Sequence, residues 1–125
     1  MEIDHLTGMI IGCAYKVYNT LGSGFLEKVY ENAMALELSK QGIWFEQQYP
    51  ITVFYDEVCI GNFIADLMIE NRLIVELKAN ENTLPVHEVQ LVNYLTATGI
   101  DNGLLINFSS AKVEVKRKFR VYRKT

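Results

Sequence analysis

Residues 63–78 read FIADLMIENRLIVELK and give the clearest indication of the fold. Two apolar runs flank Asn71-Arg72, a pattern that predicts two antiparallel strands joined by a turn. Three charged residues interrupt the runs: Asp66, Glu76 and Lys78. Glu76 and Lys78 are two residues apart and therefore share one face of their strand. A charge inside an apolar strand costs several kcal/mol unless something compensates it.

Two explanations account for these charges. In the first, the carboxylates of Asp66 and Glu76 hold a metal ion, and Lys78 places a charged donor beside a water molecule there. In the second, Glu76 and Lys78 lie on a face turned to solvent. Carboxylate ligands suit Mg²⁺ or Mn²⁺, whereas zinc is disfavoured because the sequence has no cluster of cysteine or histidine. A carboxylate-held Mg²⁺ can clamp a phosphate oxygen and activate water for in-line attack.

Strand register sets a geometric condition for that site. Directly opposite residues of an antiparallel pair share a face, and the period along each strand is two. A two-residue turn at Asn71-Arg72 pairs Asp66 with Leu77 and turns Glu76 to the other face. An odd loop, or a bulge between the two acids, brings both carboxylates to one face. We therefore predict an odd loop centred near Asn71, or a bulge between residues 66 and 76.

Periodic apolar residues predict two helices at the start of the chain. The first runs from about His5 to Asn19, with Asp4 as its N-cap. The second runs from about Phe25 to Lys40, and its predicted apolar positions are Leu26, Val29, Tyr30, Ala33, Leu36 and Leu38.

Alternation and turn residues predict the remaining elements. A third helix has Pro85 in its first turn and ends at Gly99, after Thr98. Strands are expected over 45–55, 58–69, 73–79, 103–108 and 113–122, with Asp56-Glu57 as the first turn. The order ααβββαββ predicts an α/β (α+β) fold, a mixed sheet flanked by helices, in one domain over residues 1–125.

Composition agrees with a folded domain outside the membrane. Half of the 125 residues are hydrophobic, and no apolar run approaches the ~20 residues of a membrane span. Glu2 and Asp4 at the N-terminus argue against a signal peptide. Cys13 and Cys59 are interpreted as reduced core residues, and we expect a cytoplasmic location.

Basic residues concentrate at the C-terminal end of a chain whose net charge is −3. They are Lys112, Lys116, Arg117, Lys118, Arg120, Arg123 and Lys124. Lys116, Lys118 and Arg120 alternate on one strand face, which predicts contacts with phosphates of nucleic acid. The alternative is an edge strand kept soluble by its lysines.

Two helices carry further candidate site residues. Gln90 and Tyr94 lie one turn apart and could position a phosphate or water at the metal, or else be a hydrogen-bonded amide and a half-buried tyrosine. His87 is interpreted as a surface residue at the helix N-terminus. With Gly24 as N-cap, Glu27 is the third helical residue, where an acid is favoured; alternatively, it is a third carboxylate aimed at the metal.

Together these segments resemble a known family. Residues 24–30, GFLEKVY, match the GxxExxY signature of a group within the PD-(D/E)XK nuclease superfamily. Asp66 matches the first aspartate of the superfamily pattern, although Ala65 replaces the preceding proline, and Glu76 with Lys78 matches (D/E)xK. The resemblance continues over nearly the whole chain through GSGFLEKVYENAMALEL, GNFIADLMIENRLIVELKA and HEVQLVNYLTATG.

The resemblance implies a role for each matching residue. Asp66 and Glu76 would be metal ligands, with the Leu77 carbonyl as a third and Glu27 completing or tuning the shell. Lys78 would orient the attacking water and stabilise phosphate charge. Gln90 and Tyr94, which match a QxxxY helix, would hold the substrate backbone or the lysine.

Two functions are therefore weighed. The first is a nuclease dependent on Mg²⁺ or Mn²⁺ that hydrolyses phosphodiester bonds of nucleic acid, with DNA favoured over RNA. The alternative is a non-catalytic module that keeps the nuclease fold and binds nucleic acid or protein. The sequence leaves the oligomeric state open, a homodimer included.

Overall fold

Helices and strands follow one another in the predicted order. The computed structural model describes residues 1–121, so Tyr122, Arg123 and Lys124 lie outside them. The last strand, predicted over 113–122, already ends at Phe119. The elements are α1 (Ile3–Leu21), α2 (Glu27–Lys40), β1 (Phe45–Tyr55), β2 (Val58–Ile69), β3 (Leu73–Lys78), α3 (Pro85–Thr98), β4 (Asn102–Phe108) and β5 (Val113–Phe119). No helix in this part of the chain is long and apolar enough to span a membrane.

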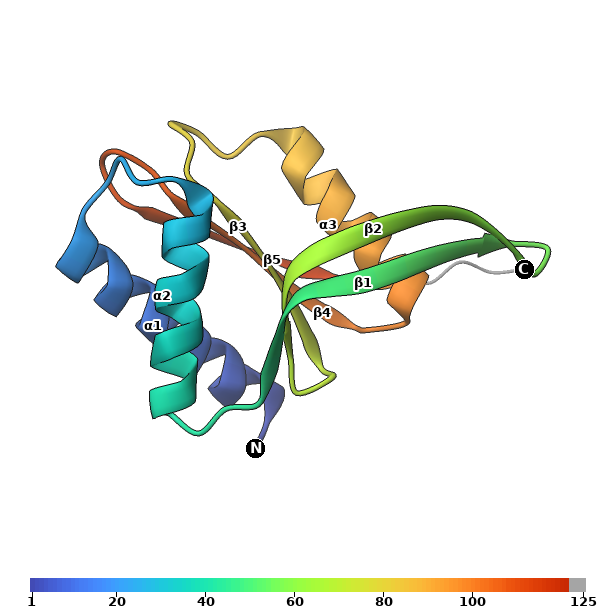
Figure 1. The fold of residues 1–125 in the computed structure, drawn as a ribbon, viewed down its shortest axis with the longest axis horizontal. Helices are drawn as coiled ribbons and strands as arrows, with labels where there is room; N and C mark the ends of the chain where they lie inside the picture. The colour runs from blue at the N-terminus through green and yellow to red at the C-terminus, as the bar shows by residue number, and fades with distance from the viewer. Residues whose placement is uncertain (122–125) are drawn as a thin grey trace.

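The strands form one mixed sheet in the order β1-β2-β3-β4-β5. Neighbouring strands are antiparallel except β3 and β4, which run parallel. Parallel neighbours need a crossover connection, and α3 supplies it between them (Figure 1). Central β3 is buried from Leu73 to Leu77, as a strand covered on both faces must be. The predicted α/β fold is confirmed.

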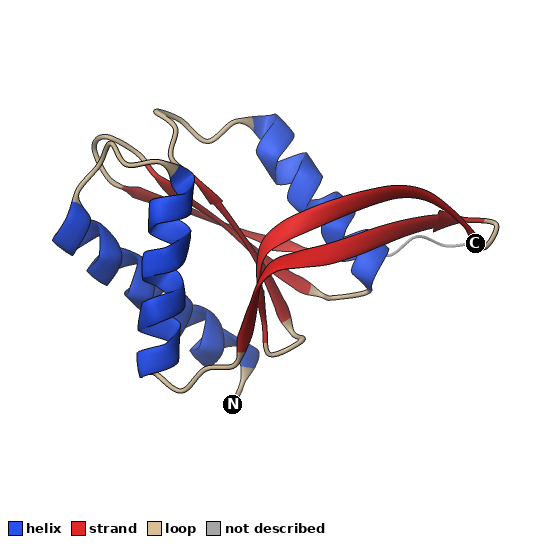
Figure 2. Cartoon of the chain, in the orientation of Figure 1, coloured by secondary structure: helices blue, strands red, loops and turns tan. Residues whose placement is uncertain are grey.

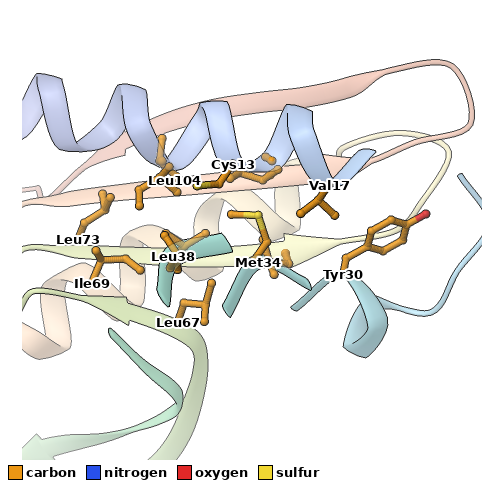
Figure 3. Close-up of a cluster of buried hydrophobic side chains, with 14 of the residues drawn as sticks. Cys13, Val17, Tyr30, Met34, Leu38, Leu67, Ile69, Leu73 and Leu104 are labelled. Atoms are coloured by element: carbon orange, nitrogen blue, oxygen red, sulfur yellow. The ribbon is translucent and has the colours of Figure 1, made fainter. Parts of the chain in front are cut away.

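Helices cover both faces of the sheet and create two apolar layers (Figure 2). Side chains of α1 and α2 pack on one face against Leu67, Ile69, Leu73 and Leu104 (Figure 3). On the other face, Leu91, Tyr94 and Leu95 of α3 pack against Met68 and Ile74, among others. Alternate residues of β3 therefore enter different layers, with Ile74 on the α3 face.

Tyr30 anchors the turn between the first two helices. Its side chain is fully buried and stacks on Phe108 with ring centroids 4.3 Å apart. Its hydroxyl donates to the Gly22 carbonyl at 2.7 Å. Gly22 and Gly24 have φ values of 74° and 100°, a region that glycine adopts without steric cost. The tyrosine of the GxxExxY segment thus has a structural task.

The N-termini of α1 and α2 differ from the prediction. The N-cap of α1 is Glu2, and Asp4 lies within the first turn. α2 begins at Glu27 with Leu26 as N-cap, so Glu27 is the first helical residue rather than the third. Neither cap residue makes a side-chain capping bond; packing of the helices on the sheet fixes their starts.

The buried face of α2 is narrower than predicted. It packs through Tyr30, Met34 and Leu38, which are spaced four residues apart. The predicted apolar positions Leu26, Val29 and Leu36 are exposed instead. Helical spacing fits several apolar sets here, and only the position of the sheet selects among them.

The hairpin of β1 and β2 extends beyond the rest of the sheet (Figure 1). Its strands pair from Phe45↔Ile69 to Tyr55↔Val58, whereas β2 pairs with β3 only over Leu67–Ile69. Asp56 and Glu57 form the predicted turn, with φ values of 49° and 65°. Cys59 is exposed near this turn, so its prediction as a core residue is wrong, whereas Cys13 is buried as predicted. Residues 52–64, which we call the outer hairpin, lie beyond the layers that bury the central strands.

Candidate active site

The loop between β2 and β3 has the odd length that the shared site requires. Ile69 pairs with Leu73, which leaves a three-residue loop centred on Asn71. Glu70 and Asn71 have φ values of 50° and 55°. The same register continues inward to Leu67↔Val75, and one step further sets Asp66 opposite Glu76. The predicted odd loop is confirmed.

The two acids lie where β2 separates from β3. Backbone pairing between the two strands ends at Leu67↔Val75. Beyond that pair, side-chain carboxylates make the hydrogen bonds between β2 and β3. The Leu77 N–H donates to Asp66 Oδ2 at 2.8 Å, and the Asp66 N–H donates to Glu76 Oε1 at 3.4 Å. Each carboxylate therefore binds a backbone N–H of the opposite strand. These reciprocal bonds hold both acids on the junction.

Burial and mutual repulsion make the acid pair electrostatically unusual. Glu76 is only 7% exposed. Its burial, followed by the charge of Asp66 and a hydrogen bond with that side chain, raises the pKa of Glu76 to about 9, against a smaller lowering effect of Lys78. At neutral pH Glu76 thus retains a proton beside Asp66. A cation between the two side chains would let both ionise.

This donor set fits a hard divalent cation. Carboxylate oxygens are the ligands that Mg²⁺ and Mn²⁺ take, and Mg²⁺ typically uses one or two carboxylates while keeping several waters. Within residues 1–121, no group of three or more histidine, cysteine, aspartate or glutamate side chains converges on one point. The site is therefore a two-carboxylate site, and Glu27 does not join Asp66 and Glu76 directly.

Lys78, Glu27 and His87 are electrostatic neighbours. Burial, and after it the charge of Lys78, lowers the pKa of His87, whereas the charge of Glu27 raises it. His87 lies in the first turn of α3, where its Nδ1 accepts the Leu84 N–H at 3.4 Å. Its predicted position at the helix N-terminus is confirmed, and the side chain is half-buried there. Glu27 is exposed at the start of α2.

Tyr94 connects the acid pair to a groove beside it. Burial, followed by the charges of Glu76 and Asp66, raises the pKa of Tyr94. Its ring lies 5.7 Å from that of Phe63 on β2. Between the outer hairpin and α3 runs a cavity of about 600 Å³, which we call the hairpin–α3 groove. It is lined by Val53, Phe54, Phe63, Gln90, Asn93, Tyr94, Thr96 and Ala97.

The basic residues Lys116 and Lys118 of β5, and Arg120 just after it, lie one strand beyond β3's neighbour β4, away from the acids. Lys118 pairs with Glu88 of α3 at 3.1 Å, and Arg120 pairs with Asp101 at 2.8 Å. Lys116 is exposed. The pairing of Lys118 with α3 sets it on the same side of the sheet as that helix. Two of the three predicted phosphate contacts are thus engaged within the chain, and their role stays a prediction.

Glu31 is a site-supporting residue that the sequence did not reveal. It is 3% exposed and accepts hydrogen bonds from Lys28, Gln47 and Gln48, the last two at 2.7 Å. Gln48 has a φ of 54° and does not pair with β2, although it lies opposite Asp66. Glu31 therefore holds a kink in β1 opposite Asp66. The adjacent amides Gln47-Gln48 in a strand were the available signal.

Known proteins agree with this fold. The family model of the PD-(D/E)XK nuclease superfamily matches residues 4–118. Among solved structures, the chain is similar to SSO0001, with a TM-score of 0.61 and 16% identity over 77% of this chain and 52% of that one. It is also similar to an alkaline exonuclease (LHK-Exo) from Laribacter hongkongensis, with a TM-score of 0.56 and 12% identity over 75% and 56%.

The match has defined limits. No curated protein matches the sequence significantly. The chain spans about half the length of the two solved structures, at 52% and 56% of each. At these identities the likeness establishes the fold, whereas the family model extends over most of the chain. This protein therefore belongs to the PD-(D/E)XK nuclease superfamily.

Proposed function

We propose that this protein is a divalent-metal-dependent nuclease that hydrolyses phosphodiester bonds of nucleic acid. The observation that carries the proposal is the acid pair at the β2–β3 junction. Asp66 and Glu76 are bonded to each other's strands, and Glu76 has a pKa of about 9 in the absence of a cation. Glu76 is buried, and a cation beside Asp66 would let both carboxylates ionise. Superfamily membership supports a nucleic-acid substrate.

Asp66, Glu76 and the Leu77 carbonyl would hold the ion. The N–H and C=O of one strand residue point to the same side, and the Leu77 N–H points to Asp66. Its carbonyl is therefore directed to the side from which β2 has departed. Glu27 would not contact the ion and would tune the electrostatics of the metal ligands indirectly, through solvent and Lys78. Bound Mg²⁺ or Mn²⁺ would polarise the phosphate and lower the pKa of a water.

The chain's other residues would orient substrate and stabilise charge. Lys78 follows Glu76 on the same strand face, where its ammonium group would orient the attacking water and donate to the phosphate. Gln90 and Tyr94 on α3 would hold the substrate beside the acid pair. Lys116, Lys118 and Arg120 would contact phosphates farther along the strand, with Lys118 and Arg120 exchanging their present carboxylate partners for phosphate.

Finer assignments belong to the same proposal. Residues 24–30 support membership of the GxxExxY group within the superfamily. We also propose DNA in preference to RNA, a cytoplasmic location, and a homodimer as the assembly to test. The alternative is a non-catalytic module that keeps the nuclease fold and binds nucleic acid or protein.

Isothermal titration with Mn²⁺ tests the metal site directly. We expect the wild-type chain to bind the ion and Asp66→Ala to lose binding. Cleavage is then measured on a panel of single-stranded and duplex DNA and RNA, with Mg²⁺, Mn²⁺ or EDTA. Binding of nucleic acid without metal binding or cleavage would favour the non-catalytic module. Cleavage that persists in EDTA would contradict the metal-dependent mechanism.

A further inference from the structure

The hairpin–α3 groove has a lining that differs from that of a phosphate site. None of its eight described lining residues is charged. Lysine and arginine neutralise phosphates, and neither is among these described residues. The lining instead combines the rings of Phe54, Phe63 and Tyr94 with the exposed amides of Gln90 and Asn93. Aromatic faces stack nucleobases, and side-chain amides hydrogen-bond to base edges. The lining is thus suited to a neutral, planar, polar-edged ligand.

The groove also adjoins the acid pair. Tyr94 lines it and is within electrostatic reach of both Asp66 and Glu76. Phe63, which faces Tyr94, lies three residues before Asp66 on the same strand. A ligand in the groove therefore lies on the α3 side of the sheet, next to the point where β2 leaves β3. Its volume, about 600 Å³, falls within the range of small-ligand sites.

We propose that the hairpin–α3 groove receives an unpaired nucleobase of the strand whose phosphate is held at the acid pair. This inference rests on the proposed nuclease function and names its substrate class, a single strand or an unpaired end. A base inside a duplex has both faces stacked and its pairing edge occupied. Entry into the groove would then require unpairing and unstacking, so a duplex is the weaker ligand.

Fluorescence anisotropy with three labelled probes tests the proposal. The probes are a short single strand, the same strand with abasic sites, and its duplex, all in EDTA so that a metal-dependent nuclease leaves them intact. We expect the wild-type chain to bind the single strand about tenfold more tightly than the abasic strand, as stacking on an aromatic side chain provides. The duplex is also expected to bind more weakly than the single strand.

Two variants and a matched control assign that preference to the groove. Phe63→Ala removes one aromatic wall, and Ala97→Trp fills the groove from an exposed helix position. Both are expected to bind the normal and abasic strands within about twofold of each other, because stacking in the groove is lost. The control is Ile64→Ala, which truncates the adjacent exposed side chain on the opposite face of the hairpin and keeps the preference. Thermal unfolding verifies that each variant is folded.

The outcomes separate this inference from the proposed function. Equal affinity for normal and abasic strands, tighter binding of the duplex, or an unchanged preference in Phe63→Ala and Ala97→Trp would overturn the groove inference. Metal-dependent cleavage in a parallel assay would then leave the nuclease function standing. If no probe is bound and none is cleaved with Mg²⁺ or Mn²⁺, the nuclease function and the groove inference are both wrong.

Discussion

Asp66 divides β2 into an outer part that precedes it and an inner part that follows it, and the two parts are unusual in opposite ways. The inner part ends at Ile69 among strands buried on both faces, and yet a pair of acidic side chains lies at its junction with β3. The outer part begins at Val58, and its apolar side chains, Val58, Ile60, Phe63 and Ile64, are exposed. A buried polar side chain and a cluster of exposed apolar side chains are each more informative than their common opposites.

Asp66 marks the border between these two parts. There the β2–β3 ladder stops, and β1 is kinked at Gln48 on the other side of the same strand. Because β2 leaves the sheet at this point, the acids reach one another and the outer hairpin stands away from the sheet beside α3. The separation of β2 from β3 at Asp66 thus forms both the acid pair and one wall of the groove. Because the acids lie at the inner part of β2 and the groove lies along its outer part, substitutions can disturb each part separately.

The largest expected effect is on catalysis at the inner part. Lys78→Ala removes the donor beside the acid pair, and we expect cleavage to fall about 10²–10³-fold, the loss typical for one donor to developing charge. Steady-state cleavage of the best substrate in the panel measures it. Lys112→Ala, an exposed lysine after β4, is the control and should leave the rate unchanged. A fully active Lys78→Ala protein would remove Lys78 from the mechanism.

Glu76 should make metal-free stability depend on pH. Its folded pKa of about 9 lies above the ordinary value of 4.5, so its favourable contribution is present in full below pH 4.5. It is lost as pH rises toward 9, because the unfolded chain releases the proton first. The slope approaches about 1.4 kcal/mol per pH unit in this window.

Urea unfolding in EDTA between pH 5 and pH 9 measures this contribution as the difference between wild type and Glu76→Gln. The variant carries a neutral amide throughout and should lack this part of the slope. Added Mn²⁺ should stabilise the wild type increasingly as pH rises. Parallel pH profiles of wild type and variant would mean that Glu76 is already ionised in the folded protein.

Local signals predicted the elements and the acid pair. Pro85 and Gly99 delimit α3 as expected, because proline at a helix start and glycine after its end act through their own backbone geometry. The three-residue loop followed from the requirement that Asp66 and Glu76 share a face. Face and register depend on neighbours in the sequence, so they could be predicted.

Long-range packing determined what the sequence left open. Glu31 takes its amide partners from β1, 16 and 17 residues away, and no periodicity encodes that choice. Exposure of Leu36 and Cys59 depends on where the sheet ends and which stripe of α2 meets it. The groove likewise requires the angle between the outer hairpin and α3, which only the assembled fold defines.

Glu31 should act on the inner part as a positioning residue. Glu31→Ala removes the carboxylate that accepts hydrogen bonds from Gln47 and Gln48, and we expect a loss of about 1.5–3 kcal/mol of stability, as is typical for hydrogen bonds to a charged group. Because the kink at Gln48 then relaxes opposite Asp66, Mn²⁺ affinity should fall as well, measured by titration well below the unfolding temperature. Glu37→Ala on the same helix, which breaks ion pairs with Lys16 and Lys40, is the matched control. It should leave Mn²⁺ affinity unchanged; an equal loss in both variants would mean that Glu31 supports only the fold.

The smallest expected effect concerns the basic residues of β5 and Arg120 just after it, outside both parts of β2. Lys118 and Arg120 already have carboxylate partners, so phosphate contacts there would replace existing ion pairs and add little net affinity. Changing Lys116, Lys118 and Arg120 together to alanine should weaken binding equally for all sequences. Each lost phosphate contact should reduce the slope of log affinity against log salt by about 0.7–0.9.

The measurement is anisotropy with the single-stranded probe over a salt series, with Lys112→Ala as control. The preference for the normal over the abasic strand should survive the triple change, because it arises in the groove beyond the acid pair. A triple variant with an undiminished salt slope would show that β5 does not contact nucleic acid, and its lysines would then serve only as a charged sheet edge.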